Sequence, residues 1–129
     1  MKTKKRFPND IVAAIQKEKI IGIRAGKDSD HRIIGIWAVV VEGRVFVRSW
    51  SLKPRSWWRT FLEDPHGIIV IGEKEIPIRA IKTRSERLKD LVSAAYKEKY
   101  NMPGSVHYVE DMSRDPSRDT TTELVPIQE

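Results

Sequence analysis

The chain has 129 residues, no cysteine and a formal net charge of +6. This length suits one domain with its own core, and the absence of cysteine excludes disulfides, thiolate metal sites and cysteine nucleophiles. The positive charge favours anionic partners, with nucleic acid as the first class to consider. Much of the excess charge lies in the first six residues and between Arg44 and Arg59, so we expect 1–7 to be a solvated basic tail.

The N-terminal segment is basic, but no apolar run of signal-peptide length follows it, and no stretch is long and apolar enough to span a membrane. We therefore expect a cytoplasmic protein without a membrane partner. Residues 1–129 are expected to form one domain.

Local patterns in the first third predict a helix followed by strands. Residues 8–18 carry an apolar stripe at helical spacing, and 20–24 alternate like a strand. Residues 25–31 are rich in turn formers. Residues 32–41 are apolar after Arg32, which predicts one long strand buried on both faces.

The segment WAVVVEGRVFVRSWSLKPRSWWR, from Trp37 to Arg59, contains all four tryptophans and a dense group of arginines. Its two β-prone runs are separated by Glu42-Gly43, which predicts a β-hairpin. A short helix is expected near 54–63. Because the basic and aromatic residues concentrate here, we expect any ligand site to involve this segment.

The second half predicts two more strands, at 68–71 and 75–82, and then a long helix near 84–100. Thr83 and Glu86 have the spacing of a capping box at its start.

We expect residues 104–119 to be irregular and 120–127 to add a last strand. This order of elements indicates an α+β protein built on a small antiparallel β-barrel with flanking helices.

Strand alternation places Arg44, Phe46, Arg48 and Trp50 on one face of the strand that ends the hairpin. Cations beside aromatic rings suit a flat anionic ligand. The alternative is a solvated face on which the arginines lie over the rings.

Two further segments carry phosphate-binding chemistry. Arg55 and Arg59 lie four residues apart near a helix start, where a bound phosphate offsets their repulsion; the alternative is neutralisation by Glu63 and Asp64. The loop from Gly26 to Arg32 offers a glycine, a serine and cations, although such loops are most often hairpin turns.

Other chemistries have little support in the sequence. The three histidines are widely spaced, so no metal site is expected. No serine has a nucleophile-elbow context, and no carboxylate pair or acid–base residue is marked out.

The run IWAVVVEGRVFVRSWSLKPRSWWRTFLEDPHGIIVIGEKEIPIRA, with the later AAYKEKY, resembles a bacterial family of small uncharacterised proteins, domain of unknown function 2255. The likeness covers roughly Ile20 to Asn101. Its most distinctive pieces are VVEGRVFVRS, SWWR and YKEKY.

More distantly, the layout is similar to the split β-barrel superfamily that binds flavin mononucleotide or the deazaflavin F420, including the pyridoxamine-phosphate-oxidase-like proteins and the deazaflavin-dependent nitroreductases. In this resemblance Gly26 to Arg32 corresponds to a Gly-Arg-Lys-Ser-Gly-type loop and Arg48-Ser49 to a strand end. Trp57-Trp58 corresponds to an aromatic pair, and Asp64-Pro65 to an Asn-Pro segment. The loop keeps only part of the family chemistry, and Trp50 to Pro54 replace an expected Gly-Gly loop.

Together these features predict a flavin- or deazaflavin-binding protein, with an oxidoreductase activity that the cofactor would supply, and the resemblance also implies a homodimer. The expected cofactor-binding residues are Lys27, Ser29, Arg32, Arg48, Ser49, Trp50, Lys53, Arg55, Trp57, Trp58 and Arg59. Two alternatives stay open: a small barrel that binds single-stranded nucleic acid, and a cofactor-free structural or ligand-sensing dimer.

Overall fold

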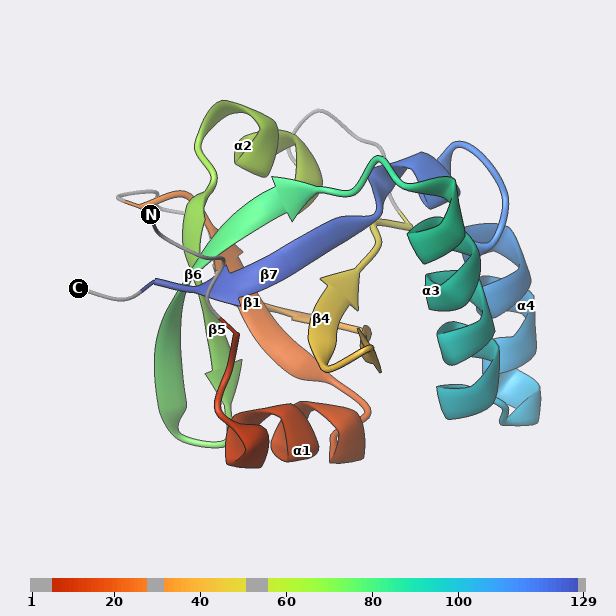
Figure 1. The fold of residues 1–129 in the computed structure, drawn as a ribbon, viewed down its shortest axis with the longest axis horizontal. Coiled ribbons are helices and arrows are strands. Elements are labelled where there is room, and N and C mark those ends of the chain that lie inside the picture. Colours follow the sequence, from red (N-terminus) through yellow and green to blue (C-terminus); the bar gives the residue numbers. More distant parts are fainter. Residues whose placement is uncertain (1–5, 28–31, 51–55, 128–129) are drawn as a thin grey trace.

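The computed structural model describes residues 6–27, 32–50 and 56–127. The elements are α1 (Asn9–Lys17), β1 (Ile21–Ala25), β2 (Ile34–Ile36), β3 (Ala38–Val41), β4 (Arg44–Val47), α2 (Trp57–Glu63), β5 (His66–Ile71), β6 (Lys74–Lys82), α3 (Glu86–Lys99), α4 (Pro103–Met112), the 3-10 helix η1 (Ser117–Thr120) and β7 (Thr122–Pro126). Figure 1 shows the strands grouped in the centre, with helices below, above and to one side.

The strands form a single antiparallel sheet in the order β2-β1-β5-β6-β7-β4-β3. The two edge strands, β2 and β3, are consecutive in the chain and are separated only by Trp37. One segment therefore supplies both edges, so the sheet curls into a nearly closed barrel. The predicted α+β class with a small antiparallel split barrel is confirmed.

The long strand expected at 32–41 is divided at Trp37. Its first part pairs with β1 and its second part with β4. The expected burial of both faces is also wrong for the first part, because Ile34 on β2 is exposed.

The β3–β4 hairpin forms as predicted, with Val41 paired to Arg44 across the turn. Glu42 and Gly43 have φ values of 55° and 73°. Positive φ at both positions is what a two-residue turn of this type requires, and glycine adopts it without steric cost.

The barrel interior is apolar, and α1 lies across its lower end in Figure 1. Ile11 and Ile15 of α1 are buried in the same cluster as Ile23, Val45 and Leu124. The predicted helix at 8–18 thus closes one end of the barrel.

Helix α3 packs against the outer face of β3, and α4 lies beside α3. A second apolar cluster lies between the sheet and these helices, and it includes Phe46 and Val39 from the sheet and Val92 from α3. Phe46 is fully buried there, so its expected place on a ligand-facing surface is wrong. Alternation identified the face correctly, but α3 covers it.

The long predicted helix is observed at Glu86–Lys99, but its N-cap is Ser85, whose Oγ accepts the Leu88 N–H at 3.2 Å. The expected cap at Thr83 is wrong. Thr83 is buried and donates its own N–H to the Thr121 carbonyl at 2.9 Å, which keeps the chain extended for two more residues.

Residues 104–119, expected to be irregular, contain most of α4 and the start of η1. Pro103 begins α4 at a position where a missing N–H costs no intrahelical bond. Only Ser105, Val109 and Met112 of this helix are buried, which explains the weak apolar pattern.

Among the described helices, none combines the length and apolarity needed to cross a bilayer.

Candidate functional site

A cavity of about 540 Å³ opens between β2, the chain after β4, the start of α2 and helix α4. This volume lies in the range that small-molecule and cofactor sites occupy. Its described lining residues are Ile23, Ala25, Arg32, Ile34, Gly35, Ile36, Trp37, Arg48, Ser49, Trp50, Ser56, Trp57, Tyr108 and Met112.

The wall on the α4 side is a series of aromatic rings in contact. Trp37 stacks on Tyr100 with centroids 4.3 Å apart and planes 7° from parallel. Tyr108 meets Trp37 edge-on at 6.2 Å and Trp50 edge-on at 5.5 Å. Trp50 and Tyr108 remain 58% and 43% exposed, so two ring surfaces are available at the cavity mouth.

The hydroxyl of Tyr96 fixes two of the lining residues. It accepts the Arg48 backbone N–H at 3.1 Å and donates to the Trp37 carbonyl at 2.6 Å. Burial raises the pKa of Tyr96, so this hydroxyl keeps its proton at neutral pH.

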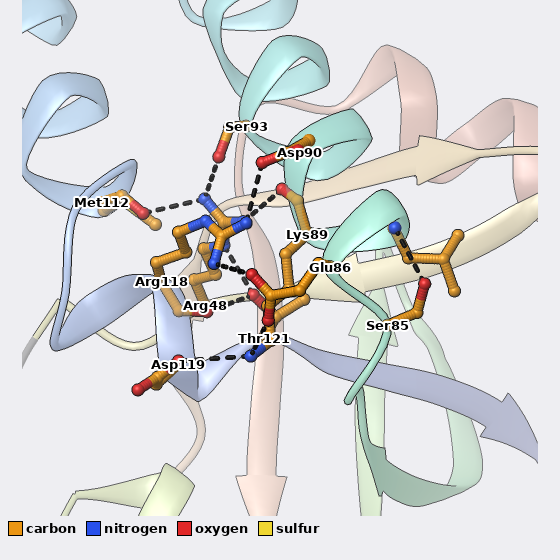
Figure 2. A network of polar contacts seen from close by, with 11 residues as sticks. Arg48, Ser85, Glu86, Lys89, Asp90, Ser93, Met112, Arg118, Asp119 and Thr121 are labelled. Carbon is orange, nitrogen blue, oxygen red and sulfur yellow. Dashed lines mark hydrogen bonds and ion pairs between the residues drawn. The ribbon is translucent and has the colours of Figure 1, made fainter.

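Arg48 is 2% exposed and belongs to the buried wall of the site. Figure 2 shows its guanidinium between α3, the end of α4 and Thr121. Nε donates to Thr121 Oγ1 at 2.8 Å, Nη1 to Ser93 Oγ and the Met112 carbonyl at 2.8 Å each, and Nη2 to the Lys89 carbonyl at 2.6 Å. Four of the five guanidinium N–H groups therefore donate to acceptors within the protein.

Burial, and to a smaller extent the charge of Arg118, lower the pKa of Arg48 to about 10, although Tyr96, Asp90 and Asp115 act in the opposite direction. The side chain remains a cation at neutral pH. Arg48 therefore has little donor capacity left for the direct contact with a ligand that the sequence predicted.

A second group of charges at the protein surface holds η1 against α3, as Figure 2 also shows. Arg118 contacts Glu86 at 2.8 Å and Asp90 at 2.7 Å. Lys89 bridges Glu86 at 3.3 Å and Asp119 at 3.2 Å.

With η1 held in place, its side chains fix Ser49. Thr120 Oγ1 accepts the Ser49 N–H at 2.8 Å, and Ser117 Oγ donates to the Ser49 carbonyl at 2.7 Å. The chain leaving β4 is thereby held rigidly where it lines the cavity.

Arg32 and Ser56 both line the cavity but differ in exposure to solvent. Arg32, at the rim, is exposed and has no hydrogen bond or ion pair with any described residue. Ser56 Oγ is buried and has no hydrogen-bond partner in the described structure. A buried polar atom is normally bonded, so this hydroxyl is available to a ligand.

Lys27, two residues after β1, is held to the end of α2 by a carboxylate. Asp64 accepts the Lys27 backbone N–H at 2.9 Å and the His66 backbone N–H at 3.1 Å, and it contacts His66 Nδ1 at 3.1 Å. The bonds from Lys27 and then His66 lower the pKa of Asp64. Arg55 lies outside the described residues, so the alternative that Glu63 and Asp64 neutralise Arg55 and Arg59 stays a prediction.

The cavity brings together five of the expected site residues: Arg32, Arg48, Ser49, Trp50 and Trp57. Three others lie elsewhere: Lys27, Trp58 and Arg59, of which Arg59 lies over the Trp58 ring at 5.4 Å. The remaining three, Ser29, Lys53 and Arg55, fall outside the described residues.

Arg44, expected beside Arg48, is engaged with Glu123 of β7 through Nε at 3.0 Å and Nη2 at 2.7 Å. The sequence missed Trp37 and Tyr108 as site residues. Trp37 reads as barrel core, and Tyr108 lay in the segment expected to be irregular. The only sequence signal for Tyr108 was that it is adjacent to Val109, an apolar residue of a helix.

The arrangement can bind and orient a planar ligand, and no acid–base residue stands out in it. No aspartate or glutamate is among the described lining residues, and no group of three or more potential metal ligands occurs in the described part of the chain.

A family model described as an uncharacterised protein conserved in bacteria (DUF2255) matches residues 11–124. No curated protein sequence matches the chain.

Several solved structures have a similar fold. A putative pyridoxamine 5'-phosphate oxidase from Listeria innocua has a TM-score of 0.64 at 12% identity, covering 93% of each chain. A conserved hypothetical protein from Mycobacterium tuberculosis has a TM-score of 0.60 at 13% identity, covering 98% of this chain and 86% of that one. An F420-H2 dependent reductase has a TM-score of 0.57 at 18% identity, covering 83% and 93%. At these identities the likeness establishes the fold alone.

Proposed function

The chain belongs to this bacterial family, DUF2255, and from that premise we propose that its cavity binds a flavin-type cofactor, flavin mononucleotide or the deazaflavin F420. The observation that carries the proposal is the cavity itself, which combines exposed aromatic rings with cations and has no described carboxylate in its lining. Similar folds in proteins named as an F420-H2 dependent reductase and a putative pyridoxamine 5'-phosphate oxidase support it.

The residues present fit a ligand with a flat ring and a phosphate. Trp50 and Trp57 offer stacking surfaces for the ring. Arg32, which has no partner among the residues that the structure describes, offers a guanidinium to a phosphate, and the Ser56 hydroxyl offers a buried hydrogen-bonding group. Ser29, Lys53 and Arg55 are proposed to add phosphate contacts when the ligand is bound.

The proposed activity is that of an oxidoreductase. A bound flavin-type ring supplies hydride- and electron-transfer chemistry. The chain binds and orients the ring and excludes water from its buried face.

The experiment is an absorbance spectrum of gently purified protein, followed by titration with flavin mononucleotide and with F420. We expect binding with Kd on the order of ten micromolar or tighter.

An Arg32→Gln variant should lose affinity for flavin mononucleotide by about three- to tenfold and keep its affinity for riboflavin, which lacks the phosphate. Absence of binding to both cofactors at tens of micromolar would refute the proposal, and salt-sensitive binding of oligonucleotides instead would favour the nucleic-acid alternative.

We further propose that the protein is a homodimer that uses the outer face of β1 and β2. Ile20 and Ile33, which directly precede β1 and β2, are large apolar side chains that remain 61% and 47% exposed. β2 also pairs only with β1 and lines the cavity through Ile34 and Gly35, so a second copy here would lie next to the site. Sedimentation should give twice the chain mass, and Ile33→Asp should give a monomer that is still folded; a monomeric wild type would exclude this dimer.

A further inference from the structure

Arg48 is a buried cation that has no carboxylate partner among the described residues. Its four hydrogen-bond acceptors are the hydroxyls of Thr121 and Ser93 and the carbonyls of Met112 and Lys89, all of them neutral. Charged side chains are almost never fully buried unless they are paired. Asp90 and Asp115 attract the guanidinium without bonding to it, and Asp90 is bonded to Arg118 instead at 2.7 Å.

The surroundings do not offset this charge from the cavity side. The lining contains Arg32 as a second cation and, among the described residues, no aspartate or glutamate. Four well-directed hydrogen bonds compensate the loss of water around the guanidinium but leave its net charge in place. The positive field therefore extends into a space whose walls are largely apolar, where it is screened weakly.

We propose that the cavity selects a planar aromatic anion, and that Arg48 provides this selectivity through its charge rather than through a direct hydrogen bond to the ligand. Arg48 is then a positioning residue that determines which charge state of a ligand the cavity accepts. The aromatic surfaces of Trp50 and Tyr108 select the flat shape, and the buried cation selects the charge.

Arg32 and Arg48 should differ in their response to salt. Arg32 is exposed, so added ions screen its attraction for a ligand. Arg48 is 2% exposed, so its contribution should persist at high ionic strength.

The test compares two probes of matched shape, naphthalene-2-sulfonate, an anion, and naphthalene-2-sulfonamide, which is neutral. Their affinities are measured by calorimetry at about 0.05 M and about 0.5 M salt. The wild type should prefer the anion by about tenfold or more at both salt concentrations. Arg32→Gln should reduce the preference at low salt only.

Two substitutions separate charge from geometry. Arg48→Met should abolish the preference for the anion, whereas Arg48→Lys, which retains the positive charge but not the planar guanidinium, should keep most of it. Circular dichroism checks that each variant is folded. If Arg48→Met does not fold, the role of the charge is tested by two other results: a preference of the wild type that resists salt, and the same preference in Arg48→Lys.

Equal affinity of the wild type for both probes, or a preference that disappears at high salt, would overturn the inference. Loss of the preference in a folded Arg48→Lys would overturn the role of charge. The outcome does not depend on the flavin: a protein that binds neither cofactor but prefers the sulfonate would refute the proposed function and leave this inference standing.

Discussion

Lys99 lies buried at the C-terminal end of α3, where its ammonium donates to the carbonyls of Ile15 at 2.8 Å and Ala38 at 2.6 Å. These bonds connect α1, β3 and α3 without a carboxylate. Burial, and next the charge of Lys19, lower the pKa of Lys99 to about 8. The stability of this junction should therefore depend on pH.

The folded chain holds the Lys99 proton less tightly than the unfolded chain, in which lysine titrates near about pH 10.4. Between about pH 8 and 10 the unfolded state binds more protons, so the free energy of unfolding contributed by Lys99 rises with pH. Urea unfolding should show wild type gaining about 1–2 kcal/mol relative to Lys99→Met between about pH 7.5 and 9.5. Parallel pH profiles of the two proteins would contradict the assignment.

Gly67 of β5 is required by close packing rather than by an unusual φ. A Cβ at this position would lie 2.5 Å from the Arg24 carbonyl oxygen and 2.9 Å from the Phe61 ring. Gly67→Ala should cost about 2–3 kcal/mol of unfolding free energy, measured by urea denaturation. The control is Gly104→Ala in α4, where nothing lies within 4 Å and alanine should stabilise by about 0.5–1 kcal/mol. Equal effects would show that the contact around Gly67 relaxes freely.

At the scale of elements, β7 is the strand that joins the two halves of the sheet, because it lies between β6 and β4. Besides the ladder, a buried two-point ion pair between Glu123 and Arg44 connects β7 to β4. A similar two-point pair between Arg87 and Glu42 is exposed at the end of the β3–β4 hairpin. Both are arginine–glutamate pairs, and they differ in how deeply they are buried.

Removing one arginine from each pair should separate the effect of burial. Arg44→Gln removes both charge-assisted hydrogen bonds from the buried Glu123 carboxylate and should cost about 2–4 kcal/mol. Arg87→Gln leaves Glu42 in contact with water, as it already is in the wild type, and should cost less than about 1 kcal/mol. Thermal and urea unfolding of both variants measure the difference, and a cost for Arg87→Gln equal to that of Arg44→Gln would argue against burial as the cause.

For the molecule as a whole, the cavity depends on how the barrel closes. Trp37 divides the segment that supplies both sheet edges, and its ring stacks on α3 through Tyr100. Tyr108 of α4 then brings Trp50 into the same wall. Closure of the sheet and docking of two helices together create the site.

Trp37 and Trp50 should therefore separate folding from binding. Trp50→Ala, at an exposed ring, should change the unfolding free energy by less than about 1 kcal/mol and weaken an aromatic ligand by about tenfold or more. Trp37→Ala removes a stacked ring from the closure point and should cost about 3 kcal/mol of stability as well as affinity. Unchanged affinity in Trp50→Ala would remove this ring from the site.

The sequence by itself determined the elements whose signals are local. The stripe of α1, the Glu42-Gly43 turn, the long α3 and the β-prone end of the chain each depend on residues a few positions apart, and all are observed. The same signals determined the α+β class, whereas the family was indicated by a resemblance carried by VVEGRVFVRS, SWWR and YKEKY. Local patterns succeed here because periodicity records which face of an element is apolar.

Only the tertiary structure decided what covers each face. The partners of the Arg48 guanidinium lie 41 to 73 residues away in the sequence, so a residue predicted to touch a ligand directly is instead bonded to α3, α4 and Thr121. Tyr108 and Trp37 likewise meet only because α4 packs beside α3 on the barrel. A cation on a strand has the same sequence pattern whether water, a helix or a ligand lies above it, and the choice among these is made by long-range packing.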